Sequence, residues 1–373
     1  MKIFFCLILF VTSIFTNLLG NNKIVVYERT MNDYLCFRIP AIIKAPDNSL
    51  LAFAEARKKN SADSGDIDLV MRKSTDWGNT WSPIQIIWDD GENTCGNPSP
   101  VVDLTTGRIW LFLTWNDGRD IEKNIENRRS HNTRRVYVLF SDDSGQSWSK
   151  PVDMTTSVKF PEWTWYATGP CHGIQKSKLP HKNRLIIPAN HKKIVNEAGN
   201  VSVKSYSHVI YSDDNGASWH IGGTVYPDGG NESSVVELSD GRVMLNMRSY
   251  HKTDSCRSMA ISENAGITWS KRRMQKELIE PRCQGSILSY SSDSLLNELY
   301  FSNPHSFNRN NLSILRSLDN GESWSLLSVV EKNSAAYSDM VLLNNDTIGI
   351  LYECGSLKEK YNTICFQIIP INH

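Results

Sequence analysis

Apolar and polar positions alternate along this chain in short runs that are separated by turn-forming residues. Runs rich in β-branched, aromatic and leucine residues are each followed by glycine, asparagine, aspartate or serine. Examples are Ile109–Trp115, Val136–Phe140, Leu185–Ala189 and Val243–Met247. No amphipathic segment exceeds two or three helical turns, and no low-complexity linker divides the sequence. This pattern predicts a single all-β domain from about residue 23 to residue 373.

Two segments depart from the β pattern. At the N-terminus, Lys2 precedes the apolar run Ile3–Val11 and a more polar stretch that ends at Gly20. This is typical of a signal peptide over residues 1–20, with an uncleaved anchor as the alternative. We therefore expect an exported protein, and extracellular, periplasmic and lysosomal destinations all stay open. The charged stretch Asp117–Arg135 predicts a long inserted loop with a short helix and a solvated face.

A near-identical octapeptide occurs five times. Its copies are STDWGNTW from Ser74, SDDSGQSW from Ser141, SDDNGASW from Ser212, SENAGITW from Ser262 and SLDNGESW from Ser317. They start 67, 71, 50 and 55 residues apart, which suits one copy per four-stranded propeller blade with loop insertions. The aspartate, or Asn264 in the fourth copy, and the glycine predict a tight turn. The closing tryptophan is expected to pack on its own blade, so we interpret these copies, called Asp-boxes below, as structural.

Composition narrows the partners. Lys plus Arg and Asp plus Glu are 40 each, so the formal net charge is zero. This gives no support for nucleic acid or an anionic membrane as a partner, and anion recognition would need a local basic cluster. Seven cysteines follow residue 20, so at least one has no partner within the chain. No C-x-x-C pair occurs, so we expect no metal site.

Two motifs near the start suggest a family. Phe37-Arg38-Ile39-Pro40 is followed by LLAFAEARKKNSADSGDIDLVMRKS from Leu50. Together with the five Asp-boxes, these motifs resemble the sialidase (neuraminidase) family, and most of all its single-domain secreted bacterial members and the animal lysosomal sialidase. The resemblance implies a six-bladed β-propeller and an exo-α-sialidase that needs no cofactor. Its partners would be sialylated glycans, whether glycoproteins, gangliosides or oligosaccharides.

The resemblance assigns three arginines to the carboxylate of sialic acid. A planar carboxylate is held best by guanidinium groups, which stay charged and donate in pairs. The matching residues are Arg38 in FRIP, Arg257 in SCRSMAIS and Arg309 in NPHSFNRNNLSILRS. Arg38 and Arg257 lie in or beside apolar strand patterns, where an arginine is costly unless it is paired or binds an anion. A structural salt bridge is the alternative for any one of them.

The chemistry of the family needs a nucleophile, a base and an acid. The sialic acid carboxylate would repel an anionic nucleophile, so the family uses a tyrosine, which Tyr337 in AAYSDM matches. Glu232 in GGNESSVVELSDGR matches the base, which is needed because free tyrosine has a pKa near 10. Asp63 in SADSGD matches the acid, with Asp66 and Asp68 as nearby competitors. The implied reaction retains configuration through a sialyl-tyrosine.

Further positions are expected to support the sugar site. Arg57 in EAR should line the pocket, and Glu353 in LYECG should orient the first arginine by offsetting its buried charge. In EWTWYATGPCHGIQ, Trp163 and Trp165 are candidates for the side of the leaving glycan, with a place in the core as the alternative. Asn97 in CGNPSPVVD resembles a loop residue near the pocket for the N-acyl group.

Three other functions stay open at this level. A trans-sialidase would place a second sugar, rather than water, over the covalent intermediate. A sialoglycan-binding propeller would have lost catalysis, although every matched catalytic position is filled here. An Asp-box scaffold of the receptor or assembly-factor kind would have no sugar site. Neither the oligomeric state nor the linkage preference is written in the sequence.

Overall fold

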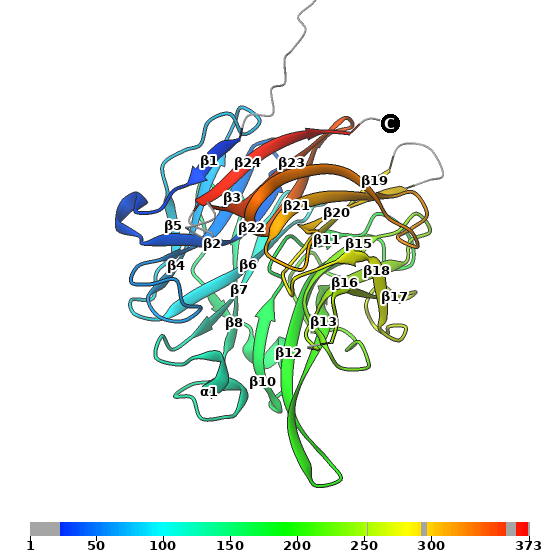
Figure 1. Ribbon diagram of the computed structural model, residues 1–373. Helices are drawn as coiled ribbons and strands as arrows, with labels where there is room; N and C mark the ends of the chain where they lie inside the picture. Colours follow the sequence, from blue (N-terminus) through cyan, green and yellow to red (C-terminus); the bar gives the residue numbers. More distant parts are fainter. Residues whose placement is uncertain (1–22, 252, 292–296, 356–362, 372–373) are drawn as a thin grey trace, which may run out of the picture.

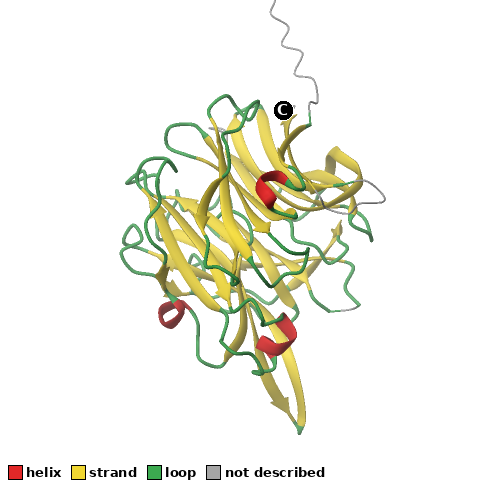
Figure 2. Cartoon of the chain, turned by 90° about the vertical axis from the view of Figure 1, so that its left-hand side faces the viewer, coloured by secondary structure: helices red, strands yellow, loops and turns green. Residues whose placement is uncertain are grey.

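Nearly all the regular secondary structure of the described residues is β-strand, as the sequence predicts. The computed structural model describes residues 23–251, 253–291, 297–355 and 363–371. Within these ranges the chain forms twenty-four strands and three short helices. Figures 1 and 2 show strands throughout the body and one long hairpin that projects from it. The expected signal peptide, residues 1–20, lies outside the described residues.

Most strands fall into six groups of four, and within each group every strand is hydrogen-bonded to the next. Group one comprises β2 (Cys36–Lys44), β3 (Leu50–Arg57), β4 (Ile67–Ser74) and β5 (Gln85–Trp88). Group two comprises β6 (Thr94–Val102), β7 (Ile109–Asn116), β8 (Arg135–Ser141) and β9 (Val152–Asp153). Group three comprises β10 (Trp163–Thr168), β12 (Leu185–Glu197), β13 (Asn200–Ser212) and β14 (His220–Ile221), and β11 (Ile174–Gln175) also pairs with β12. The projecting hairpin of Figure 1 is β12–β13.

The second half of the chain continues this arrangement and closes it. Group four comprises β15 (Gly230–Glu237), β16 (Val243–Ser249), β17 (Cys256–Ser262) and β18 (Arg273–Ile279). Group five comprises β19 (Ser286–Ser291), β20 (Asn297–Pro304), β21 (Asn310–Ser317) and the first half of β22 (Ser325–Asn344). Group six comprises the second half of β22, β23 (Thr347–Cys354), β24 (Thr363–Pro370) and β1 (Ile24–Tyr27). Group six therefore contains strands from both ends of the described chain.

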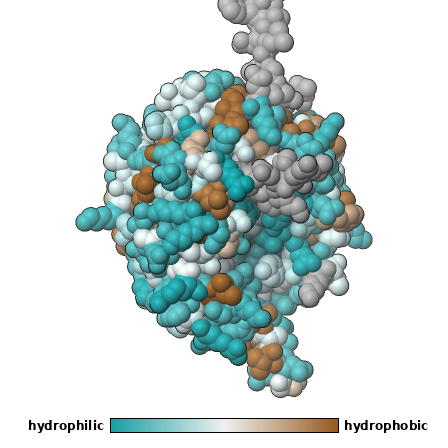
Figure 3. Space-filling model, turned by 60° about the vertical axis from the view of Figure 1, so that its left-hand side comes forward, coloured by the Kyte–Doolittle hydropathy of each residue, from teal (hydrophilic) through white to brown (hydrophobic). Residues whose placement is uncertain are grey.

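Helices are few and short within the described residues. They are η1 (Met31–Asp33), α1 (Glu122–Glu126) and α2 (Thr155–Val158). The short helix expected within residues 117–135 is therefore confirmed as α1. None of the described helices is long and apolar enough to cross a membrane. On the face drawn in Figure 3, hydrophobic residues are scattered among hydrophilic ones rather than gathered in one patch.

The apolar core is divided into clusters that lie between neighbouring groups. Groups one and two share the cluster around Phe53 and Leu111, and groups two and three share the cluster around Phe112 and Ile187. The junctions that follow, three with four, four with five and five with six, each have a cluster of their own. A further cluster, which includes Phe366, joins group six back to group one. Each group therefore buries apolar residues against both of its neighbours, and the series closes on itself.

Each Asp-box forms the same hydrogen-bonded turn. In the second box, Ser141 Oγ donates to Asp143 Oδ1 at 2.8 Å and accepts from the Gly145 N–H at 2.8 Å. The same carboxylate oxygen accepts from the Ser147 N–H at 2.9 Å. The other four boxes repeat these bonds, with Asn264 in place of aspartate in the fourth. The turn is thus held by side chains of the repeated residues themselves.

The boxes also connect neighbouring groups. All five box glycines have φ between +83° and +93°, and each faces a side chain of the preceding group or, for the first box, of group six. These partners are Phe366, Leu51, Trp110, Val209 and Met244, in box order. Three box tryptophans, Trp81, Trp148 and Trp219, likewise contact aromatic rings outside their own groups. For these three residues the expected packing on their own blade is wrong, because the turn directs the rings into the junction. Trp324 of the fifth box, in contrast, contacts Phe301 of its own group, as expected.

A buried carboxylate fastens strands from separate groups near the centre. Asp339 on β22 is fully buried, and its oxygens accept from the Ile42 N–H of β2 at 2.9 Å and from Ser286 Oγ of β19 at 2.7 Å. His172 Nδ1 lies 2.7 Å from the same carboxylate. Burial by itself would lower the pKa of His172, but the Asp339 carboxylate raises it above its usual value. The inner strands are therefore held in fixed relation, and the candidate site is built on them.

Candidate active site

A cavity of about 150 Å³ lies where the inner strands of several groups meet. Charged and polar side chains dominate its walls, and most of the residues expected from the sequence are among them. The lining residues are Arg38, Ile39, Glu55, Arg57, Asp63, Asn97, Glu122, Arg134, Trp165, Ala167, Asn190, Asn231, Glu232, Arg248, Tyr250, Arg309 and Tyr337.

Irregularities in five strands direct these side chains into the cavity. The strand register shifts between Arg38 and Ala41 in β2, and Ile39 has φ +59°, which is rare for a β-branched residue. Similar shifts occur in β6, β10, β15 and β22, in each case next to a residue that lines the cavity. Such bulges turn a side chain away from the regular alternation of a strand. The inner ends of five strands are thus adapted to the cavity rather than to the sheet.

Tyr337 and Glu232 form a short hydrogen bond inside the cavity. The Tyr337 hydroxyl donates to Glu232 Oε1 at 2.5 Å, and Arg248 Nη1 donates to Glu232 Oε2 at 2.6 Å. The same arginine nitrogen lies 3.0 Å from the Tyr337 oxygen. Burial and the Glu232 carboxylate raise the pKa of Tyr337 well above its usual value, although Arg248 and Arg309 act in the opposite direction. Tyr337 is thus a neutral phenol whose proton already points at a base.

Arg38 is held by Glu353, as the sequence predicts. Its Nε and Nη2 donate to the two oxygens of Glu353 at 3.1 and 3.0 Å. Glu353 is fully buried and also accepts from the Ile39 N–H at 2.8 Å. Burial by itself would lower the pKa of Arg38, but the Glu353 carboxylate raises it above its usual value. The guanidinium therefore stays charged and is fixed in one orientation.

Three guanidinium groups converge around the tyrosine. Arg38 Cζ lies 5.3 Å and Arg309 Cζ 5.5 Å from the centre of the Tyr337 ring. Arg309 comes from the loop between β20 and β21, and its Nη2 donates to the Arg282 carbonyl at 3.3 Å. With Arg248, which pairs with Glu232, these residues form a cluster of positive charge in the cavity wall. Such a cluster suits a planar anion.

The expectation that Arg257 lines this cavity is wrong. Arg257 is fully buried outside the cavity, where Nη1 pairs with Glu280 at 3.1 Å and Nε donates to Asn246 Oδ1 at 2.7 Å. Arg248, which the sequence interpretation missed, occupies the cavity instead. The signal was present, because a hairpin that turns at Asp240–Gly241 pairs β15 with β16 and brings Glu232 opposite Arg248.

Asp63 lies at the cavity mouth beside two guanidinium groups. Its Oδ1 is 2.9 Å from Arg57 Nη1 and 3.6 Å from Arg38 Nη1, and 75% of its side chain is exposed. Partial desolvation raises the pKa of Asp63, but Arg57 and Arg38 more than offset this and hold it below its usual value. Asp66 and Asp68 do not line the cavity, since both pair with Lys58.

Glu55 and Trp165 also line the cavity. Glu55 accepts from Arg57 Nη2 at 2.6 Å and from the Asn97 N–H at 2.9 Å. Arg134 donates to Asn97 Oδ1, and its Cζ lies 4.0 Å from the centre of the Trp165 ring. Burial lowers the pKa of Arg134 to about 10. Because Arg134 lies in the cavity wall, the expected solvated face of residues 117–135 is wrong for this side chain.

Trp163 does not contact the cavity, contrary to expectation. It belongs to the core and stacks on His191 with ring centres 3.5 Å apart. His191 Nδ1 lies 3.1 Å from His208 Nδ1, and His208 Nε2 lies 3.1 Å from the Tyr166 hydroxyl. Burial lowers the pKa of His208 to about 3 and that of His191 well below its usual value. Both rings are therefore neutral, so that one Nδ1 donates and the other accepts.

A larger cavity of about 620 Å³ adjoins the first and shares Asp63, Glu122, Trp165 and Tyr250 with it. Its other walls are α1, the base of the β12–β13 hairpin and the loop after β16. Lys192 of the hairpin is buried here and pairs with Glu122 at 2.6 Å and Glu126 at 2.8 Å. The side of the site beyond Asp63 therefore opens into a roomy space with acidic and basic groups in its walls.

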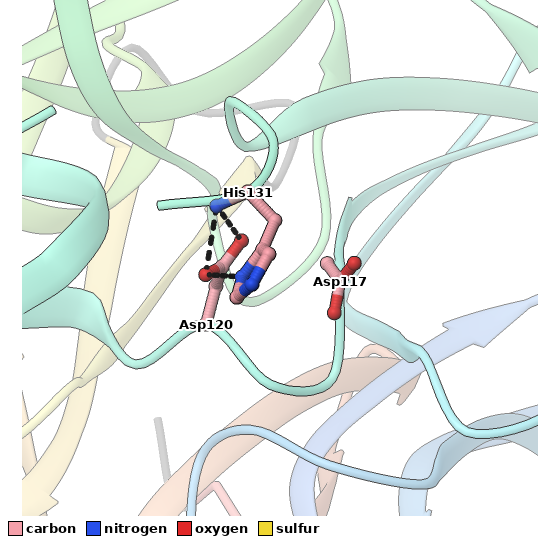
Figure 4. A group of neighbouring side chains, drawn as sticks. All are labelled: Asp117, Asp120 and His131. Carbon is pink, nitrogen blue, oxygen red and sulfur yellow. Dashed lines mark hydrogen bonds and ion pairs between the residues drawn. The ribbon is translucent and has the colours of Figure 1, made fainter. Parts of the chain in front are cut away.

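One cluster in the described part of the chain has the composition of a metal site. Asp117, Asp120 and His131 lie close together on the inserted loop (Figure 4). Asp117 is paired through both oxygens with Arg119, at 2.9 and 2.6 Å. Asp120 accepts from the His131 N–H and contacts its Nδ1 at 2.9 Å. These bonds already use the carboxylates to fold the loop, and we assign the cluster a structural role.

Comparison with known proteins identifies the class to which this fold and site belong. Residues 48–351 match the family described as BNR repeat-like domain, and the chain belongs to this family. Its relatives are sialidases, so the similarity to sialidases expected from the motifs is confirmed. The sialidase of Bacteroides fragilis (strain YCH46) is 31% identical over 340 residues, which are 85% of this chain and 60% of that protein.

Two further comparisons cover more of the partner's length. Sialidase-3 of Mus musculus is 28% identical over 402 residues, covering 91% of this chain and 92% of that protein. The structure of the Hadza microbial sialidase Hz136 has a TM-score of 0.77 and 26% identity, and covers 91% of this chain and 66% of that one. The propeller-like fold of this chain is thus that of sialidases.

Proposed function

We propose that this chain is an exo-α-sialidase that hydrolyses terminal α-linked sialic acids with retention of configuration. The observation that carries the proposal is the 2.5 Å hydrogen bond from Tyr337 to Glu232, within a cluster of three guanidinium groups. A buried tyrosine that faces a carboxylate base is a nucleophile that stays neutral until it attacks. This arrangement suits a substrate that carries its own negative charge next to the reacting carbon.

The substrate carboxylate would be held by Arg38, Arg248 and Arg309. Arg38 is already oriented by Glu353, so little rotamer freedom remains to be lost when an anion binds. Arg248 holds Glu232 and lies against the tyrosine oxygen, so it links the seat of the carboxylate to the nucleophile. An anion bound there would draw positive charge away from Glu232 and make that carboxylate a stronger base.

Tyr337 then attacks the anomeric carbon while its proton passes to Glu232. Asp63 gives its proton to the leaving oxygen, and it later takes a proton from the water that cleaves the sialyl-tyrosine. Arg57 and Arg38 hold the pKa of Asp63 below its usual value. A substrate carboxylate on Arg38 offsets part of that positive charge and raises the pKa of Asp63 toward the protonated form that an acid requires.

The leaving part of the glycan would occupy the larger cavity beyond Asp63. Trp165 lines both cavities and can contact the substrate on each side of the scissile bond. Sialylated glycoproteins, gangliosides and oligosaccharides are therefore the proposed partners. We further propose that the six groups are the blades of a six-bladed propeller, and that the chain is exported by a signal peptide over residues 1–20.

The test is hydrolysis of 4-methylumbelliferyl sialic acid between pH 4 and 7 by the wild type and a Tyr337→Phe variant. Loss of the nucleophile should lower kcat/KM by at least about 10³-fold while the unfolding temperature is retained. Tyr137→Phe, at a tyrosine outside the cavity, is the matched control and should keep full activity. Retained turnover in folded Tyr337→Phe protein would refute the mechanism.

Two product measurements complete the test. Proton NMR of the first product formed should detect the α-anomer of sialic acid, which retention requires. Adding lactose with 4-methylumbelliferyl sialic acid as donor distinguishes hydrolysis from transfer, because a trans-sialidase would form sialyllactose whereas a hydrolase would release free sialic acid. If folded wild-type protein releases nothing, but binds sialyllactose, the chain is a binding propeller instead.

A further inference from the structure

Two cysteines lie against each other on the last two strands. Cys354 ends β23 and Cys365 lies in β24, and the strand register sets Tyr352 opposite Cys365 and Cys354 opposite Thr363. The two cysteines are therefore diagonal neighbours on one face of the sheet. Their Sγ atoms are 2.8 Å apart, and both residues are buried in the cluster between groups five and six.

The remaining five described cysteines are in a different situation. Cys36, Cys95, Cys171, Cys256 and Cys283 are buried, and burial raises the pKa of each thiol. In contrast, a hydrogen bond from Cys365 lowers the pKa of Cys354, and the nearby Lys23 ammonium acts in the same direction. Lys23 is itself held by Glu331 at 2.7 Å. Cys354 is therefore the thiol most easily ionised in this pair, and its partner is within reach.

We propose that Cys354 and Cys365 are a cross-linking site at which an intramolecular disulfide joins β23 to β24. The oxidant is a small-molecule disulfide such as oxidised glutathione, acting while the strands assemble. The Cys354 thiolate attacks one sulfur and releases one glutathione thiolate, and the Cys365 thiolate then attacks Cys354 Sγ and releases the second. Two protein thiols thus lose two protons and two electrons, and one glutathione disulfide becomes two glutathione thiols.

The cross-link would act directly behind the candidate site. Glu353, which holds Arg38, precedes Cys354 and points to the opposite face of the same strand. Fixing β23 to β24 therefore also fixes the backbone from which Glu353 projects. The disulfide closes a loop of twelve residues, from Cys354 to Cys365. Restricting such a loop in the unfolded chain should raise the unfolding temperature of a protein of this size by about 4 °C.

The test uses the full chain refolded in a buffer of oxidised and reduced glutathione. Free thiols are blocked with iodoacetamide under denaturing conditions, and peptides are mapped by mass spectrometry without reductant. We expect one cross-linked peptide that joins Cys354 to Cys365, while the other five described cysteines carry the alkyl group. Dithiothreitol should remove the cross-link and lower the unfolding temperature by about 4 °C.

A Cys354→Ser/Cys365→Ser variant and a Cys256→Ser control make the result specific. The double variant should have the unfolding temperature of the reduced wild type and no response to dithiothreitol, whereas Cys256→Ser should respond as the wild type does. Complete alkylation of both Cys354 and Cys365 in the oxidised sample would overturn the proposal. A cross-linked wild type with an unchanged unfolding temperature would overturn the stabilising role. Neither readout depends on sialidase activity.

Discussion

Replacing the glycine of one Asp-box by alanine tests how the groups are joined. Gly216, in the third box, has φ +87°, and a Cβ built there would overlap the indole ring of Trp110 in group two. That ring cannot easily move, because it packs against Phe140 and Trp219 at 5.4 and 5.9 Å between ring centres. Gly216→Ala should therefore force the junction of groups two and three apart.

The control for backbone strain is Gly199 at the tip of the β12–β13 hairpin. Its φ is +86°, nearly equal to that of Gly216, but nothing lies within 4 Å of a Cβ built there. Both substitutions place alanine in left-handed backbone, which costs about 1–2 kcal/mol. Only Gly216→Ala adds overpacking of the core, which costs about 1–3 kcal/mol more. The difference between the two variants thus isolates the contact with Trp110.

The assay is guanidinium unfolding at 25 °C followed by far-UV circular dichroism, which does not depend on tryptophan fluorescence. We expect the free energy of unfolding of Gly216→Ala to lie about 1–3 kcal/mol below that of Gly199→Ala, with equal denaturant slopes. If the two variants agree within about 0.5 kcal/mol, the box glycines serve only their own turns. The interpretation that they seal neighbouring groups would then be refuted.

The remaining predictions concern acid stability and the two arginines Arg248 and Arg257. The pKa of His208, lowered by burial to about 3, lies below the value of about 6.5 in an unfolded chain, so stability should be complete above pH 6.5 and fall as the pH falls. Lowering the pH from 7.5 to 5.0 should reduce the free energy of unfolding by about 2 kcal/mol through this histidine alone. The urea midpoint should therefore fall less for His208→Gln than for the wild type, and an equal fall in both proteins would refute this role of His208. Arg248→Ala should lower kcat/KM by about 10²-fold or more at unchanged unfolding temperature, because the site loses the one of its three guanidinium groups that contacts both Glu232 and the Tyr337 oxygen. Arg257→Met should instead destabilise the fold by about 3–5 kcal/mol by leaving Glu280 unpaired. If Arg257→Met lost activity at full stability and Arg248→Ala lost stability at full activity, Arg257 would be the site residue and Arg248 the structural one.

Much of the fold could be predicted because short stretches of sequence determine its strands and turns. Alternating apolar runs give strands, and an aspartate and a glycine at fixed spacing give a turn that closes through its own side chains. The direction in which the box tryptophans pack could not be predicted in this way. Trp148 contacts Phe53 of another group, and this choice depends on how the sheets meet, which no single segment encodes.

The candidate site also combines residues that short motifs identify with residues whose place depends on strand pairing. Arg38, Glu232, Tyr337 and Glu353 could be recognised from short motifs, and the structure brings them together. Two errors came from strand geometry. Arg248 and Arg257 both stand in strands near acidic residues, and only the register of the β15–β16 pair shows which one faces Glu232.

The second error has a similar cause. Trp163 and Trp165 are two residues apart, so a regular strand would point both to the same side. A register shift between Trp163 and Tyr166 separates them, leaving one in the core and one in the cavity. Arg134 was missed because it ends a charged loop whose path across the cavity depends on contacts with three other segments.

The pairing of β1 with β24 delays the completion of the fold during protein synthesis. Ile24 lies opposite Phe366, so the first described strand must wait for the last before its backbone groups are paired. During synthesis, β1 leaves the ribosome more than 300 residues before its partner. Five groups can assemble in order as they emerge, but the junction between group six and group one forms only after β24 has emerged. Until then β1 is an open strand edge, and the nascent chain is vulnerable to pairing with a neighbour at that edge.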